Sequence, residues 1–97
     1  MSGVIPPYEP GTRNIPEKIT DQCRNLFTHA ASVLAAADAG WEHVVKMEFW
    51  LPDDAERQIV ESEWQRIFPS KHDAPARQTH FVRGGPATAS FTAYLDD

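Results

Sequence analysis

The segment from Ala74 to Thr79 places an arginine just after a proline, at the start of an expected β-strand. Pro75 fixes its own φ and disfavours helical geometry at the residue before it, so an extended segment can begin at a defined point. Arg77 and Thr79 then project from one strand face, because alternate residues share a face. A guanidinium beside a hydroxyl and backbone N–H groups is well suited to bind a planar carboxylate through paired hydrogen bonds. The alternative interpretation is a surface or interface arginine that closes a salt bridge.

The composition predicts one small globular domain. The chain has 97 residues, of which 41% are hydrophobic, and three of them are tryptophan. These values favour a packed core over disorder, and they fit a single domain over residues 1–97. The formal net charge is −5 with the histidines neutral. Because this charge repels phosphate backbones and no cluster of Lys and Arg offsets it, nucleic acid is a poor candidate partner.

Cysteine and histidine usage argues against a disulfide or a metal site. Cys23 is the single cysteine, so no internal disulfide can form, and its place on an apolar helix face favours a buried residue over a reactive thiol. The four histidines show no metal-ligand spacing, so we expect no metal and no cofactor. No signal peptide or membrane-spanning run is visible, and we expect a cytoplasmic protein without a membrane partner.

A long amphipathic helix is predicted between Asn14 and Gly40. Asn14 has the character of an N-cap, Glu17 lies three residues after it, and Gly40 is expected to stop the helix. Steps of three and four residues separate the apolar positions, which gives one continuous stripe. These positions are Ile19, Cys23, Leu26, Phe27, Ala30, Val33, Leu34 and Ala37.

The rest of the chain alternates expected strands with one further helix. The expected elements are a strand stub at Val4-Ile5, a strand over 44–51, a helix from an Asp53 cap to near Pro69, and strands over 77–82 and 87–95. In the 44–51 strand, every second residue from Val45 should pack on the helices. The opposite face carries Lys46, Glu48 and Trp50, and it needs a partner. The order predicts an α+β fold with two helices on one face of a single sheet.

Four motifs resemble, in the correct order, those of a known family. They are Ser2-Gly3-Val4-Ile5-Pro6 (SGxIP), the helix from Gln22 to Gly40 (Q-x-x-x-x-L…A-G), Val44-Val45-Lys46 before a strand (V-V-K-x-x-x-[FW]-L), and Pro75-Ala76-Arg77-Gln78-Thr79 (P-A-R-x-x). Together they resemble the Rid family of reactive intermediate deaminases, also called YjgF-like and formerly L-PSP endoribonucleases. The match extends over nearly the whole chain.

The resemblance implies a fold, an assembly and a reaction. It implies a homotrimer of chorismate-mutase-like α+β subunits, with the sheets in a central barrel, the helices outside and a pocket at each subunit boundary. In typical members an arginine grips the carboxylate of a 2-imino or 2-enamino acid, and water converts the substrate to a 2-oxo acid and ammonia. By position, Arg77 is the anchor, Thr79 is a neighbouring contact, and Ser2 and Gly3 form a backbone wall.

Two departures from the family pattern affect the expected site. The opening hairpin of the family has no counterpart before Ser2, so we expect a sheet without it. The glutamate that activates water in typical deaminating members corresponds to Thr92, whose hydroxyl can orient water but cannot take its proton near neutral pH. Glu61, at a pocket-edge position of the family, is the candidate substitute; the alternative is an ordinary exposed helical carboxylate.

Three functions follow, in order of preference. The first is an imine or enamine deaminase in which Arg77 anchors the substrate and Thr92 or the substrate's own carboxylate directs the water. The second is a non-catalytic trimer that binds small oxo or imino acids. The third is a ribonuclease, which the acidic charge and the absence of a basic, aromatic-rich track oppose.

Overall fold

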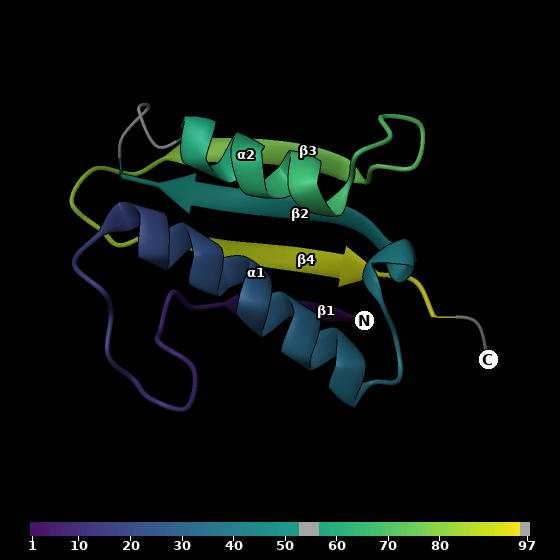
Figure 1. The fold of residues 1–97 in the computed structure, drawn as a ribbon, viewed down its shortest axis with the longest axis horizontal. Helices are drawn as coiled ribbons and strands as arrows, with labels where there is room; N and C mark the ends of the chain where they lie inside the picture. The colour runs from purple at the N-terminus through teal and green to yellow at the C-terminus, as the bar shows by residue number, and fades with distance from the viewer. Residues whose placement is uncertain (53–56, 96–97) are drawn as a thin grey trace.

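The computed structural model describes residues 1–52 and 57–95. It consists of a four-stranded sheet with two helices packed on one face (Figure 1). The strands are β1 (Ser2–Ile5), β2 (Val44–Leu51), β3 (Ala76–Phe81) and β4 (Thr88–Ala93), in the order β1-β4-β2-β3. β4 is antiparallel to both β1 and β2, whereas β2 and β3 are parallel. The helices are α1 (Ile19–Ala36) and α2 (Arg57–Ile67), and a short 3₁₀ helix, η1 (Trp41–His43), leads into β2. The expected α+β class, with both helices on one face, is confirmed.

Alternate residues of the two central strands form the core beneath the helices. Met47, Phe49 and Leu51 of β2 have no exposed surface, and Phe91 and Ala89 of β4 pair with the first two of them. Because successive strand residues point to opposite faces, this alternation covers one face of the sheet with apolar groups. The helices contribute Cys23, Leu26, Phe27, Ala30 and Leu34 from α1 and Val60 and Trp64 from α2.

A bulge in β2 reverses one expected orientation. Val44 pairs with Ala93 and Lys46 pairs with Thr92, so Val45 is an extra residue on the β2 side. Val44 is buried as a result, while Val45 is 50% exposed. The expectation that Val45 faces the helices is therefore wrong, because one inserted residue shifts the alternation by one position.

α1 begins at Ile19, later than the sequence suggested. The carbonyl of Asn14 accepts a hydrogen bond from the N–H of Glu9 (2.9 Å), and its own N–H donates to Thr12 Oγ1 (3.1 Å). These bonds hold Asn14 in a loop, so the expected N-cap at this residue is wrong. Lys18 takes the cap position and makes no side-chain cap bond.

α1 also ends earlier than expected, at Ala36 and not near Gly40. Asp38 adopts a left-handed conformation with φ of 56°, and the N–H of Ala39 donates to the carbonyl of Leu34 at 2.8 Å. This is the Schellman type of helix end, which usually carries glycine at the left-handed position. The sequence concealed it because an aspartate occupies that position.

The other boundaries agree closely with expectation. β3 starts and ends one residue before the expected 77–82, β4 is shorter than the expected 87–95, and the expected N-terminal stub is the full strand β1. α2 ends at Ile67, close to the expected Pro69. The expected Asp53 cap lies outside the described residues.

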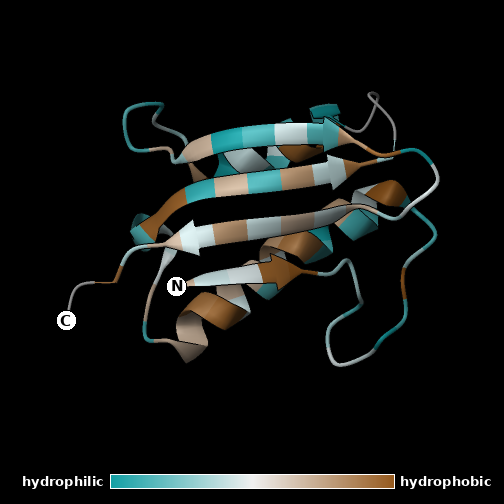
Figure 2. Ribbon diagram, turned by 180° about the vertical axis from the view of Figure 1, so that it is seen from behind, coloured by the Kyte–Doolittle hydropathy of each residue, from teal (hydrophilic) through white to brown (hydrophobic). Residues whose placement is uncertain are grey.

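The second face of the sheet carries polar, charged and aromatic groups, and no described helix covers it (Figure 2). His80 stacks on Trp50 with ring centroids 5.3 Å apart, and its Nε2 lies 2.9 Å from Glu48 Oε2. Lys46 Nζ lies 3.2 Å from the same carboxylate. Both neighbours lower the pKa of Glu48, and the hydrogen bond with His80 is the larger cause. Val4 is 80% exposed on this face, so charged and apolar groups share it.

The left-handed residue at the end of α1 gives a stability prediction. Asp38→Gly should raise the free energy of unfolding by about 0.5–1 kcal/mol, because glycine adopts positive φ without steric cost. Ala37→Gly is the matched control, since Ala37 has φ of −96° and glycine there only adds freedom to the unfolded chain. Urea unfolding at one protein concentration measures both; an equal gain in the two variants would contradict the assignment.

Candidate functional site

The register of β3 determines where Arg77 points. β3 is an edge strand of the described sheet and pairs in parallel with β2, with Arg77 opposite Met47. Met47 is fully buried under the helices, and paired residues project from the same face. Arg77 therefore extends toward α2, on the helix side of the sheet.

Two residues of α2 hold the guanidinium. Arg77 Nη2 lies 2.6 Å from Glu61 Oε2, and Arg77 Cζ lies 4.9 Å from the centroid of the Trp64 ring. Glu61 and Trp64 are three residues apart and so share a helix face. Arg77 therefore does form a salt bridge, as the alternative interpretation expected, and it also makes a cation–π contact with Trp64.

A hollow opens beside this ion pair, so the guanidinium is not sealed. It has a volume of about 580 Å³ and lies between the C-terminal part of α2 and the start of β3. The side chains of Arg77 and Glu61 are 31% and 39% exposed. Aromatic and proline residues supply apolar walls, and Lys71 supplies a second cation. The full lining is Glu61, Trp64, Gln65, Phe68, Pro69, Lys71, Ala74, Pro75 and Arg77. This combination suits a small organic acid.

The electrostatics of Glu61 bear on its expected role. The hydrogen bond from Arg77, followed by that from Gln65, lowers the pKa of the Glu61 carboxyl below its ordinary value of 4.5. A carboxylate with a lowered pKa is a weaker proton acceptor. The geometry therefore makes Glu61 a permanent negative charge beside Arg77, and it disfavours the role of general base.

The remaining predicted residues lie elsewhere in the fold. Thr79 shares the helix-facing side with Arg77 and pairs with the buried Phe49. Ser2 and Thr92 pair with each other on the uncovered face. Gly3 lies under Phe91, where an added Cβ would come within 3.0 Å of the ring. Close packing is thus a sufficient reason for glycine at that position.

One chain therefore does not bring the predicted site together. Arg77, Thr79 and Glu61 lie on the helix side, while Ser2 and Thr92 lie on the opposite face. Two strand spacings, about 10 Å, separate β4 from β3, so Thr92 cannot reach a ligand held by Arg77 in the same chain.

Two neighbours of these groups were not singled out from the sequence. Trp64 belongs to the buried core, and its ring also contacts the Arg77 guanidinium. Lys46 pairs with Thr92 across the sheet and places a cation on the uncovered face. The expected alternation of the 44–51 strand already placed Lys46 on that face, but only the register of the sheet shows that Thr92 lies beside it.

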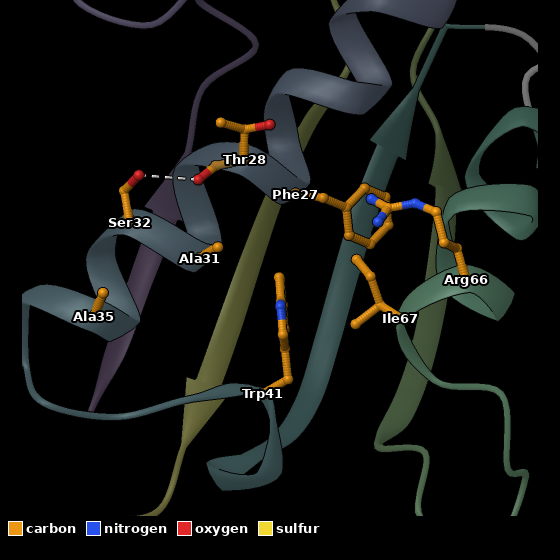
Figure 3. A pocket seen from close by; sticks show the side chains of 8 residues that line it. All are labelled: Phe27, Thr28, Ala31, Ser32, Ala35, Trp41, Arg66 and Ile67. Atoms are coloured by element: carbon orange, nitrogen blue, oxygen red, sulfur yellow. Dashed lines mark hydrogen bonds between the residues drawn. The ribbon is translucent and has the colours of Figure 1, made fainter.

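A second hollow, of about 450 Å³, lies between the two helices (Figure 3). Residues of α1 form one wall, Arg66 and Ile67 of α2 form the other, and Trp41 closes one end. The Ser32 hydroxyl donates to the carbonyl of Thr28 at 3.1 Å, as Figure 3 shows. None of the predicted site residues lines this hollow.

Within residues 1–52 and 57–95, no group of three or more His, Cys, Asp or Glu side chains is arranged to hold a metal ion. In the same part of the chain, no helix has the length and apolar character that a membrane span requires.

Solved structures with the same architecture cover almost all of this chain. A putative endoribonuclease from Thermotoga maritima has a TM-score of 0.84 at 19% identity, over 98% of this chain and 77% of that one. RidA from an Antarctic Psychrobacter has a TM-score of 0.83 at 21% identity, over 96% and 77%. Escherichia coli TdcF with bound serine gives 0.82 at 21%, over 97% and 78%. At these identities the likeness defines the fold class, a YjgF/Rid-type α+β domain.

The sequence itself identifies the family. Residues 1–91 match the model of the family described as Endoribonuclease L-PSP, so the protein belongs to that family. Reactive Intermediate Deaminase A, chloroplastic, from Arabidopsis thaliana is 28% identical over 89 residues, which are 92% of this chain and 46% of the relative. The chain thus spans about half the length of that curated relative. The Rid resemblance carried by the four motifs is confirmed.

The ion pair at the site gives a titration prediction. In Arg77→Gln the pKa of Glu61 should rise toward 4.5, because the largest cause of its lowering is removed. In the wild type, the stabilisation from this pair is present at neutral pH and is lost as the pH falls through the lowered pKa of Glu61. NMR titration of the glutamate side-chain carbonyls, with Glu61 assigned by Glu61→Gln, measures the shift.

Glu48 is the internal control for this titration, because its pKa is lowered by His80 and Lys46 on the other face of the sheet. Its titration should be the same in both proteins. An unchanged Glu61 titration in Arg77→Gln would show that the ion pair does not persist in solution.

Proposed function

We propose that the protein is a deaminase that hydrolyses 2-imino or 2-enamino acids to 2-oxo acids and ammonia. The observation that carries this proposal is the Arg77 guanidinium, which is fixed on β3, supported by Trp64 and open to a hollow of about 580 Å³. A guanidinium in this position can bind a carboxylate through two parallel hydrogen bonds. The Arabidopsis relative named as a reactive intermediate deaminase and the serine bound in TdcF support a small carboxylate ligand.

The proposed reaction needs little from the protein beyond orientation. A 2-enamino acid first shifts one proton from its nitrogen to carbon and becomes the 2-imino acid. Water then adds to the imine carbon and forms a C–O bond, the C–N bond breaks, and both water protons leave on ammonia. Imines hydrolyse readily, so holding the substrate and one water in line accelerates the reaction without a strong base. Thr92 is proposed to orient that water through its hydroxyl.

The site is proposed to form between subunits of a homotrimer. Arg77 and Thr92 lie on opposite faces of one chain, so a pocket that contains both must combine the β3 side of one copy with the β1–β4 side of another. The uncovered sheet face, with Val4 and the Trp50–His80 stack, would then be enclosed by neighbouring copies. Ser2 and Gly3 would supply backbone groups to the same pocket.

The second candidate is a non-catalytic trimer that binds the same small acids. The lowered pKa of Glu61 and the hydroxyl at Thr92 favour it, because neither group is a good base near neutral pH. A ribonuclease remains the third candidate. The formal charge of −5 opposes it, since nucleic-acid binding depends largely on phosphate neutralisation.

The anchor role of Arg77 is tested by its removal. Arg77→Gln should abolish acceleration of imine loss and weaken 2-oxo acid binding by at least about tenfold, because a charge-assisted paired contact is lost. The imine is generated in situ by an amino-acid oxidase, and its decay is timed with and without the protein. Arg66→Gln is the control and should behave as wild type, because Arg66 pairs with Glu63 and does not line the hollow at Arg77.

The outcome also separates the first two candidates. If the imine decays no faster with the protein than in buffer, but 2-oxo acids still bind in a way that depends on Arg77, the protein is a binding protein. Wild-type turnover by Arg77→Gln would remove Arg77 from the mechanism.

The role of Thr92 is tested in the same assay. Thr92→Val should reduce turnover by about tenfold and leave 2-oxo acid binding nearly unchanged, because the variant loses only the group that orients water. Thr88→Val is the matched control, since it alters the same face of the same strand. Equal effects of the two substitutions would contradict a specific role for Thr92.

The same variants test the shared site. A mixture of Arg77→Gln and Thr92→Val chains, unfolded and refolded together, should regain activity above that of either variant alone. Mixed trimers contain boundaries at which the intact Arg77 of one copy meets the intact Thr92 of the next. Mass spectrometry should first show that the mixed assemblies contain both chains. If such assemblies regain no activity, Arg77 and Thr92 do not act together across a subunit boundary.

A further inference from the structure

The hollow at Arg77 already contains a carboxylate of the protein's own. Glu61 Oε2 lies 2.6 Å from Arg77 Nη2, and both side chains line the hollow. A ligand carboxylate that binds the guanidinium through paired hydrogen bonds involving Nη2 competes with Glu61 for that nitrogen. Because the pair is partly exposed, it contributes little free energy and opens at small cost.

Displaced Glu61 remains beside the ligand, and its charge then matters. Its carboxyl is ionised at neutral pH, since Arg77 and Gln65 lower its pKa. A ligand with only a carboxylate would leave two negative charges to share Arg77, with Lys71 as the other cation in the lining. The ligand carboxylate and the Glu61 carboxylate would repel each other, because both are negative and lie beside the same guanidinium. A ligand with a positive nitrogen next to its carboxylate avoids this cost, because the nitrogen can face Glu61.

We propose that Glu61 is a specificity-determining residue that selects acids with a cationic amino or iminium nitrogen on the carbon next to the carboxylate. The inference rests on the proposed function, because it requires Arg77 to hold the carboxylate. The ligand replaces one internal ion pair by two, its carboxylate with Arg77 and its nitrogen with Glu61. The two protein charges are adjacent, as are the two charges of such a ligand, so the patterns match.

This role distinguishes substrate from product. The substrate carries the nitrogen, and the 2-oxo acid product does not. Once ammonia has left, Glu61 faces a carboxylate without a compensating cation, so it favours release of the product and its own return to Arg77.

The test compares three acids of similar size. L-alanine carries an ammonium group, isobutyrate replaces that group by a methyl, and pyruvate replaces it by an oxo group. Their binding to the full chain is measured at pH 7 by NMR titration of the wild type and Glu61→Gln. Glu63→Gln removes the same charge from the same helix; its carboxylate pairs with Arg66 and Arg24, and it does not line the hollow, so it is the matched control.

The wild type and Glu63→Gln should bind L-alanine about tenfold more tightly than isobutyrate, the size of effect expected for a hydrogen bond between charged groups. In Glu61→Gln this preference should disappear, and isobutyrate and pyruvate should bind about fivefold more tightly than to the wild type. Inhibition of turnover by pyruvate should increase in the same proportion in Glu61→Gln.

The remaining outcomes separate the two proposals. If the wild type binds all three acids through Arg77 with similar affinity, and Glu61→Gln changes nothing, the role of Glu61 is overturned and the anchor role of Arg77 stands. If the wild type binds none of the acids, or if Arg77→Gln binds them as well as the wild type does, the proposed function fails and this inference fails with it.

Discussion

The parallel pairing of β3 with β2 is the constraint on which the site depends. It sets Arg77 opposite the buried Met47 and so directs the guanidinium toward α2. A shift of one residue in this register would turn Arg77 to the uncovered face, away from Glu61 and Trp64. The pairing is possible because α2 carries the chain back over the sheet between the two strands, as parallel neighbours require. The fold thus places the cation, its counter-ion and the hollow together.

The ion pair between Arg77 and Glu61 reconciles the two interpretations of this arginine. The pair is a salt bridge in the ordinary sense, yet it borders an open hollow, and about a third of the Arg77 side chain is exposed. Exposed ion pairs contribute little free energy, so this pair can open at small cost. Trp64 also contacts the guanidinium, so Arg77 has a second partner on α2 besides Glu61.

Two of the proposed site residues lie on the face of the sheet opposite Arg77. Ser2 and Thr92 lie on a face that no described helix covers, and that face combines an exposed valine with charged and aromatic groups. In a single chain the proposed site residues therefore lie on opposite sides of one sheet. Association of copies would join them, and it would enclose the apolar groups that a chain of this size leaves exposed.

The sequence by itself determined the element types, their order, the family and the strand that carries Arg77. These features depend on local chemistry, namely apolar periodicity and the proline before β3, and on motifs spread along the chain. Tertiary structure decided the rest. Periodicity indicated which face of β2 the helices cover, but it cannot reveal the inserted Val45 or the left-handed Asp38. The partnership of Arg77 with Glu61 arises only where α2 crosses β3, because it depends on the distance between two elements and not on any pattern within them.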